Sequence, residues 1–162
     1  MSTDRILALV DGDANVFLTG PGGTGKSYMI HYIYRHCTQK GKRVYVTALT
    51  GIAALNLATG HALIDEESGE TTTTDFVHHP STIHKWAGIL LGKEDADVLI
   101  ARVRTYKTTV QRWRETDILV IDEVSMMPAD LLEKLNTIGK AIRNSSEPFG
   151  GIQLILSGDF LQ

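Results

Sequence analysis

The chain has 162 residues, about the length of one domain, and its 43% hydrophobic and 22% charged content excludes a disordered or collagen-like protein. A formal net charge of −3 excludes a uniformly basic protein that coats nucleic acid, but it allows a locally basic surface. The single cysteine, Cys37, excludes an internal disulfide, and no apolar run reaches membrane-spanning length, so we expect a soluble intracellular domain with no membrane partner.

The first predicted strand, Val16–Thr19, leads through a glycine-rich motif into a predicted helix from Gly25 to about Gln39. The motif matches G-x-x-x-x-G-K-[ST] in full and consists of Gly20, Pro21, Gly22, Gly23, Thr24, Gly25, Lys26 and Ser27. Its glycines allow backbone N–H groups to surround a phosphate, and the positive end of the helix dipole points at the same anion. We expect Lys26 to contact the β- and γ-phosphates and the Ser27 hydroxyl to bind Mg²⁺.

The second predicted strand, Val44–Ala48, is a nearly continuous apolar run, as expected for a strand covered on both faces of a parallel sheet. Residues 60–80 further along are polar, include four consecutive threonines and show no sustained periodicity. This composition indicates an inserted surface loop.

Residues 101–114 carry five basic side chains and no acidic one, although the net charge of the whole chain is negative. Two interpretations are open for this segment: a solvated surface, which we favour, and a contact with nucleic acid. The basic residues are Arg102, Arg104, Lys107, Arg112 and Arg114.

The third predicted strand, Ile118–Ile121, ends in Asp122 and Glu123, about a hundred residues after the glycine-rich motif. Ligands of open α/β sheets bind at the carboxyl ends of the strands, where these two carboxylates are expected. Asp122 would hold Mg²⁺, and Glu123 would polarise the water that attacks the γ-phosphate. The second carboxylate favours an ATPase that uses ATP and Mg²⁺ over a small-molecule kinase.

The last predicted elements are a helix over Ala129–Arg143 and a fourth strand over Ile152–Leu156. One apolar stripe at helical spacing supports the helix; it comprises Leu131, Leu132, Leu135, Ile138 and Ile142. Strands that alternate with helices predict an α/β fold with right-handed crossovers in three layers. A polar side chain after the fourth strand could sense the γ-phosphate, but spacing alone leaves this open.

Several strings in the same order along the chain resemble the PIF (petite integration frequency) helicases, which are superfamily 1B DNA helicases. They are FLTGPGGTGKS at 17–27, TALTGIAALN at 47–56, STIHKWAGI at 81–89, RWRETDILVIDEVSMM at 112–127 and PFGGIQLILSGDFLQ at 148–162. The resemblance implies a RecA-like motor that uses ATP to move 5′-to-3′ along single-stranded DNA and to open duplex junctions. It also implies a role in DNA repair, recombination and telomere maintenance, in the nucleus, mitochondrion or cytoplasm.

The same resemblance assigns roles to individual residues. Lys26, Glu123 and Gln162 match the family's catalytic positions, with Gln162 as the γ-phosphate sensor, and Ser27 and Asp122 match its magnesium positions. The strand-contacting motifs correspond to Thr50, Gly51, Asn56, His84 and Trp86. An exposed Trp86 could stack on a base, worth roughly 1–3 kcal/mol. An equally weighted alternative places His84 and Trp86 on a packed helix face.

The chain departs from the family pattern in three respects. Residues 1–13 contain no counterpart of the glutamine that reads adenine, and the link from Asn56 to Thr82 is longer than usual. The family also continues past Gln162 with a second RecA-like domain that supplies an arginine finger.

From these observations we expect one partial RecA-like domain over residues 1–162. Its fold would be that of a three-layer P-loop NTPase with a mostly parallel sheet in strand order 2-3-4-1. We expect it to be truncated after the fourth strand and to leave the first strand as an open edge. Two alternatives are open: a catalytically silent fragment that binds nucleotide or single-stranded DNA, and a RecD- or relaxase-like superfamily 1B helicase.

Overall fold

A parallel sheet forms the centre of the protein. The computed structural model describes residues 2–20, 25–59, 62–64, 68–69 and 71–159. In this part of the chain the sheet has five strands in the order β1-β7-β6-β2-β5, and each adjacent pair is parallel. The strands are β1 (Val16–Thr19), β2 (Val44–Ala48), β5 (Ser81–Thr82), β6 (Ile118–Asp122) and β7 (Gln153–Gly158).

The α/β fold class predicted from the sequence is confirmed, with one difference in the sheet. The four predicted strands correspond to β1, β2, β6 and β7 and lie in the predicted order, but the two-residue strand β5 is added beside β2. Within the described residues, β1 forms one edge of the sheet and pairs only with β7.

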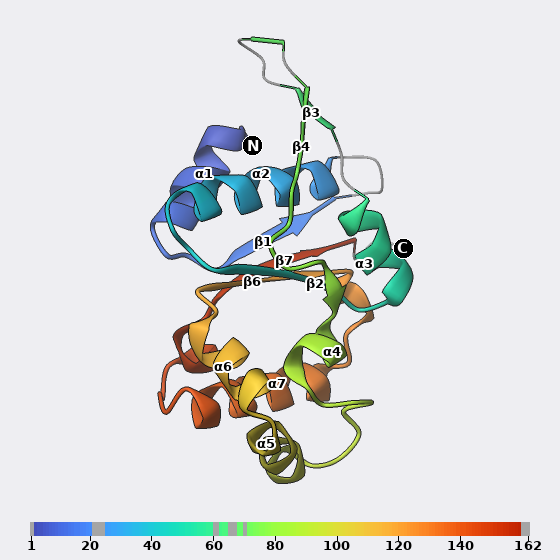
Figure 1. Ribbon diagram of the computed structural model, residues 1–162, viewed down its shortest axis with the longest axis vertical. Coiled ribbons are helices and arrows are strands. Elements are labelled where there is room, and N and C mark those ends of the chain that lie inside the picture. Colours follow the sequence, from blue (N-terminus) through green and yellow to red (C-terminus); the bar gives the residue numbers. More distant parts are fainter. Residues whose placement is uncertain (1, 21–24, 60–61, 65–67, 70, 160–162) are drawn as a thin grey trace.

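Part of the predicted loop at residues 60–80 forms a small antiparallel ribbon. Its strands are β3 (Ala62–Ile64) and β4 (Thr71–Thr73). The ribbon projects away from the sheet (Figure 1), so the described part of this segment is an excursion from the fold, as predicted, and it contains two short strands.

Helices cover both faces of the sheet (Figure 1). One layer contains α1 (Thr3–Asp11), α2 (Lys26–Gln39) and, towards the carboxyl ends of the strands, α3 (Gly51–Ala58). The opposite layer contains α4 (Ile83–Ala87), α5 (Ala96–Thr105), α6 (Lys107–Glu115) and α7 (Ala129–Ile142). Two short 3₁₀ helices, η1 (Val124–Met126) and η2 (Pro148–Gly151), complete the connections. No helix in the described ranges is long and apolar enough to cross a bilayer.

The core consists of two apolar clusters, one on each face of the sheet. Alternate residues of β6 point to opposite faces, so Leu119 and Ile121 join the cluster under α4–α7 while Ile118 and Val120 join the one under α1–α3. This double burial explains why the strands read as continuous apolar runs.

Both helices predicted from the sequence are present within one residue of their predicted bounds. On α7, the stripe residues Leu131, Leu135, Ile138 and Ile142 are all buried against the sheet. The basic segment lies mainly on α5 and α6, two helices that the sequence analysis does not predict.

Candidate functional site

The glycine-rich motif joins β1 to α2. Gly20 directly follows β1, and Gly25 precedes the first helical residue, Lys26. Gly25 has φ 84° and ψ 18°, a left-handed conformation that strains any residue with a Cβ. The Lys26 ammonium group donates a hydrogen bond to the Gly20 carbonyl, so the side chain folds back across the start of the motif. Pro21, Gly22, Gly23 and Thr24 lie outside the described residues, as does Gln162.

Ser27 and Asp122 are the candidate magnesium ligands. Ser27 lies in the first turn of α2, and Asp122 is the last residue of β6. Strands β1 and β6 both flank β7 and run parallel to it. Ser27 comes soon after the carboxyl end of β1, and Asp122 is the carboxyl end of β6, so both residues lie on the same side of the sheet. Hydroxyl and carboxylate oxygens are hard ligands of the kind Mg²⁺ prefers. Across the described ranges, no three His, Cys, Asp or Glu residues form a cluster that could hold a metal by themselves.

Glu123 has an unusual backbone conformation for its residue type. It lies between β6 and η1 with φ 56° and ψ 36°, in the left-handed region, where a non-glycine residue carries strain of about 1–3 kcal/mol. Its backbone N–H donates to Asp122 Oδ1 at 2.9 Å. The backbone turn and the Asp122 side chain are therefore linked directly by a hydrogen bond.

Thr50 contacts the Glu123 carboxylate, an interaction that the sequence analysis missed. Its Oγ1 donates to Glu123 Oε2 at 3.1 Å and accepts a hydrogen bond from the Ala53 N–H at 3.2 Å, which caps α3. The register pairs Ala48 with Asp122, so the loops after β2 and β6 leave the sheet side by side. The predicted adjacency of the second and third strands was the signal that could have revealed this contact.

The structure brings Thr50 together with His84 but separates other predicted DNA contacts. Both residues line a cavity of about 310 Å³ between the end of β2, α4 and the start of α7. Gly51 and Asn56 are exposed on α3 and do not line it. Thr50 and His84 are accessible from this side, since each is only partly buried.

Trp86 is not an exposed stacking platform. Its side chain is 2% exposed, and its ring centroid lies 4.5 Å from that of Trp113. Trp113 in turn donates from Nε1 to the Ala87 carbonyl at 3.0 Å, which fixes α6 against α4. The base-stacking expectation for Trp86 is therefore wrong in this structure, and the alternative of a packed helix face is correct for this residue.

Three arginines of the basic segment donate to main-chain carbonyls, and Arg114 does so from Nε to the Ile142 carbonyl at 3.0 Å. Arg102 forms an ion pair with Glu94 at 2.6 Å and donates to the Ile89 carbonyl at 3.0 Å. Arg112 donates from Nε to the Trp86 carbonyl at 2.8 Å, and burial lowers its pKa. These side chains stabilise the α4–α6 layer.

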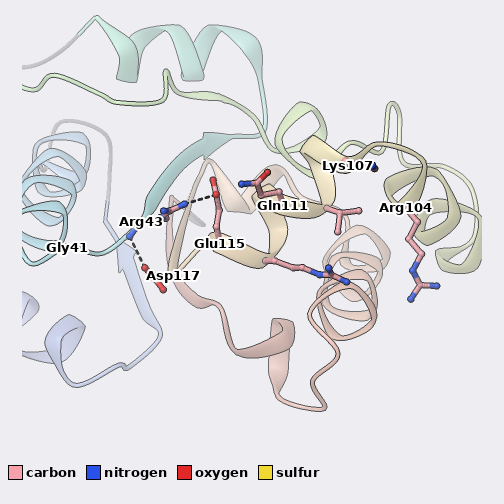
Figure 2. Close-up of a pocket in the computed structure, with 9 residues that line it drawn as sticks. Gly41, Arg43, Arg104, Lys107, Gln111, Glu115 and Asp117 are labelled. Atoms are coloured by element: carbon pink, nitrogen blue, oxygen red, sulfur yellow. Dashed lines mark hydrogen bonds and ion pairs between the residues drawn. The ribbon is translucent and has the colours of Figure 1, made fainter.

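Three basic side chains of the segment, those of Arg104, Lys107 and Arg114, line a cavity of about 910 Å³ with Arg43. Figure 2 shows Arg43, Arg104 and Lys107 in this lining. Glu115 and Asp117 share it: Arg43 pairs with Glu115 at 2.6 Å, and its backbone N–H donates to Asp117 Oδ2 at 2.8 Å. Strands β2 and β6 begin beside these residues, so this cavity, here called the basic groove, lies at the amino ends of the strands. The candidate nucleotide site lies at the opposite ends.

A family model described as "PIF1-like helicase" matches residues 7–66 and 73–162. The ATP-dependent DNA helicase RRM3 of Saccharomyces cerevisiae is 38% identical over 165 residues, which cover 100% of this chain and 20% of that protein. The ATP-dependent DNA helicase PIF5 of Trypanosoma brucei brucei is 43% identical over 159 residues, which cover 98% of this chain and 15% of that protein. The chain thus spans a fifth or less of these two relatives.

Solved structures are similar over nearly the whole chain. The crystal structure of the Pif1 helicase from Candida albicans superposes with a TM-score of 0.83 at 38% identity, covering 100% of this chain and 33% of that one. Bacteroides Pif1 bound to ssDNA gives a TM-score of 0.70 at 27% identity, and Bacteroides sp Pif1 in complex with ADP-AlF4 gives 0.74 at 27%. Each of the two Bacteroides matches covers 99% of this chain and 32% of the solved one.

Proposed function

The chain belongs to the PIF1-like helicase family, and from that premise we propose that it is the ATP-hydrolysing part of a DNA helicase motor. It would form one partial RecA-like domain over residues 1–162, with ATP bound at the carboxyl ends of the strands. The proposal rests on residues that meet at the carboxyl ends of the strands. Lys26 and Ser27 begin α2 after β1, while Asp122 ends β6 and Glu123 follows it, with β7 between the two strands.

Each residue of this edge would have a distinct task in hydrolysis. Lys26 would exchange its present acceptor, the Gly20 carbonyl, for the β- and γ-phosphate oxygens of ATP. Ser27 and Asp122 would hold Mg²⁺, which neutralises charge on the phosphates when bound. Glu123 would accept a proton from the water that attacks the γ-phosphorus, while the bond to the bridging oxygen of ADP breaks. Gln162 would sense the γ-phosphate, in line with the family pattern.

Single-stranded DNA would bind across the loops that follow β2 and β5. Thr50 and Gly51 at the start of α3, Asn56 on the same helix and His84 on α4 would contact it. The similar Bacteroides protein has been solved with ssDNA, and another similar structure concerns unwinding at forked dsDNA. A second RecA-like domain would complete the track, the 5′-to-3′ motor and the charge clamp at the γ-phosphate.

Substitution of Lys26 tests the proposal. Titration with a fluorescent ATP analogue and Mg²⁺ should show saturable binding to the wild-type chain. In the protein that carries this chain, Lys26→Ala should lower DNA-stimulated ATP hydrolysis by about 100-fold or more, as for loss of a charge-stabilising donor. Lys42→Ala is the matched control, since Lys42 is exposed at the amino end of β2.

Three outcomes separate the alternatives. Absence of saturable nucleotide binding, or a Lys26→Ala variant as active as Lys42→Ala, would overturn the site. Nucleotide binding without hydrolysis, even with DNA and the rest of the protein present, would favour the catalytically silent alternative.

A further inference from the structure

The Thr50 hydroxyl joins the candidate DNA-binding surface to the candidate catalytic base. A threonine hydroxyl has one proton to donate. In this structure Thr50 donates that proton to Glu123 Oε2 at 3.1 Å, while the Ala53 N–H occupies a lone pair of the same oxygen. The hydroxyl therefore cannot donate to a second acceptor without giving up Glu123.

The backbone holds both partners in place. The Leu49 N–H donates to the Asp122 carbonyl at 3.3 Å, immediately beside the register pair of Ala48 and Asp122. Glu123 is fixed by its left-handed turn and by the bond from its N–H to Asp122 Oδ1. The sheet sets the separation of the two backbone segments, so the Thr50 hydroxyl and the Glu123 carboxylate are held within reach of each other.

We propose that Thr50 is a positioning residue that restrains Glu123 until a DNA phosphate takes over its hydroxyl. This inference rests on the proposed function and adds the regulation of the same site. A phosphate at the cavity shared by Thr50 and His84 offers an anionic acceptor for the hydroxyl. The proton stays on Thr50 Oγ1 throughout, and only its acceptor changes.

Release changes the position that the Glu123 carboxylate can take. Without the hydrogen bond from Thr50, the carboxylate is free to turn towards the attacking water. The incoming phosphate also repels the carboxylate, because both groups are negatively charged, and favours its rotation away from α3. DNA binding thereby raises the rate of ATP hydrolysis, and the motor consumes little ATP when no strand is bound.

The test compares Thr50→Val, which keeps the shape but removes the hydroxyl, with Thr50→Ser, which keeps the hydroxyl. ATP hydrolysis is measured at saturating ATP with and without saturating single-stranded DNA, in the protein that carries this chain. Thr50→Val should raise the DNA-free kcat by about 10- to 100-fold, within the range for losing a hydrogen bond to a charged group. Its KM for ATP should stay unchanged, and its ratio of DNA-stimulated to DNA-free rates should fall towards one. Thr50→Ser should keep the wild-type ratio within about twofold.

Two further variants separate this effect from loss of the helix cap. Thr82 caps α4 by accepting from the Lys85 N–H at 3.2 Å, just as Thr50 caps α3, but the described contacts of Thr82 do not include Glu123. Thr82→Val should therefore leave the ratio unchanged. Thr50→Asp keeps a capping oxygen but has no proton to donate, and it should raise the DNA-free rate even if Thr50→Val folds poorly.

The outcomes distinguish this inference from the proposed function. A wild-type protein without DNA-stimulated hydrolysis would overturn the proposed function itself. If the wild type is stimulated but both Thr50→Val and Thr50→Asp hydrolyse ATP without DNA at the wild-type rate or more slowly, the restraint on Glu123 does not exist. The inference would also be overturned if Thr82→Val lowered the ratio of DNA-stimulated to DNA-free rates as much as Thr50→Val does. Loss of a helix cap would then be enough to explain the effect.

Discussion

Four arginine side chains of the described residues donate to main-chain carbonyls. Arg102 donates to Ile89, Arg112 to Trp86 and Arg114 to Ile142. Arg143 donates to four carbonyls, those of Trp113, Arg114, Thr116 and Gly150. Carbonyls at helix ends have no partner within the helix, and a guanidinium with five donors can serve several of them. A basic residue in the sequence is therefore often a structural brace and not a free charge.

The ion pair between Glu94 and Arg102 gives a prediction for a single residue. The hydrogen bond from Arg102 lowers the pKa of Glu94 from 4.5 to about 2. We expect NMR titration to find this low pKa and Arg102→Met to return it towards 4.5. Because the folded-state pKa is depressed, the stabilisation is present above about 4.5 and is lost as the pH falls towards 2.

Arg104→Met is the control for this titration, since Arg104 lies on the same helix but lines the basic groove. A Glu94 pKa that stays low in Arg102→Met would contradict the assignment. So would an equal rise in Arg104→Met.

The sequence was sufficient for some site residues and insufficient for others. Lys26 and Ser27 begin a helix and Asp122 ends a strand, so the local sequence pattern is enough to place all three at the carboxyl ends of the strands. Trp86 could not be decided, because its burial depends on Trp113, which lies on another helix and packs 4.5 Å away. Glu123 was assigned to the correct loop, but its contact with Thr50 depends on the register of two strands.

Helices and strands with a long apolar pattern were predicted from the sequence. Elements with a short apolar pattern, such as β5 and α6, were missed. The four strands and two helices with continuous or periodic apolar runs are present. Strand β5 has only two residues, Ser81 and Thr82, and exists because it pairs with Thr47 and Ala48. Helix α6 buries only Thr109 and Trp113, which is too few residues for a visible stripe.

The contact between α7 and η2 leads to a prediction for an element. Gly139 lies inside α7, and a Cβ there would come within 2.9 Å of the Phe149 carbonyl carbon and oxygen. Alanine normally favours a helix by about 1 kcal/mol over glycine, but here the backbone of η2 would have to shift. We expect Gly139→Ala to destabilise the fold by about 1–3 kcal/mol, measured by urea denaturation.

Gly51→Ala serves as the matched control, because Gly51 begins α3 and a Cβ there has nothing within 4 Å. It should be neutral or slightly stabilising. If Gly139→Ala were as stable as Gly51→Ala, the close approach of α7 and η2 would not limit this position.

Across the whole molecule, the two ends of the sheet differ in chemistry. The carboxyl ends of the strands carry Gly20 after β1, the two acidic residues and Thr50. The amino ends carry the basic groove, with Arg43, Arg104, Lys107 and Arg114 (Figure 2). Four cationic side chains thus gather at the amino ends, beside the carboxylates of Glu115 and Asp117. These cations lie away from the proposed DNA track, which favours the solvated-surface interpretation.

New negative charges at the two ends of the sheet test whether DNA binds at the carboxyl ends alone. In Arg104→Glu with Lys107→Glu, the changed side chains lie at the far end of the sheet, and charges beyond about 8 Å are largely screened at 0.15 M salt. We expect this pair to lower the affinity for labelled single-stranded DNA by no more than about twofold, measured by fluorescence anisotropy. Asn56→Glu, on the exposed surface of α3, should lower it by about tenfold or more, because a new carboxylate would face the phosphates. If the groove pair weakens binding more than Asn56→Glu does, the basic segment contacts nucleic acid and the track reaches both ends of the sheet.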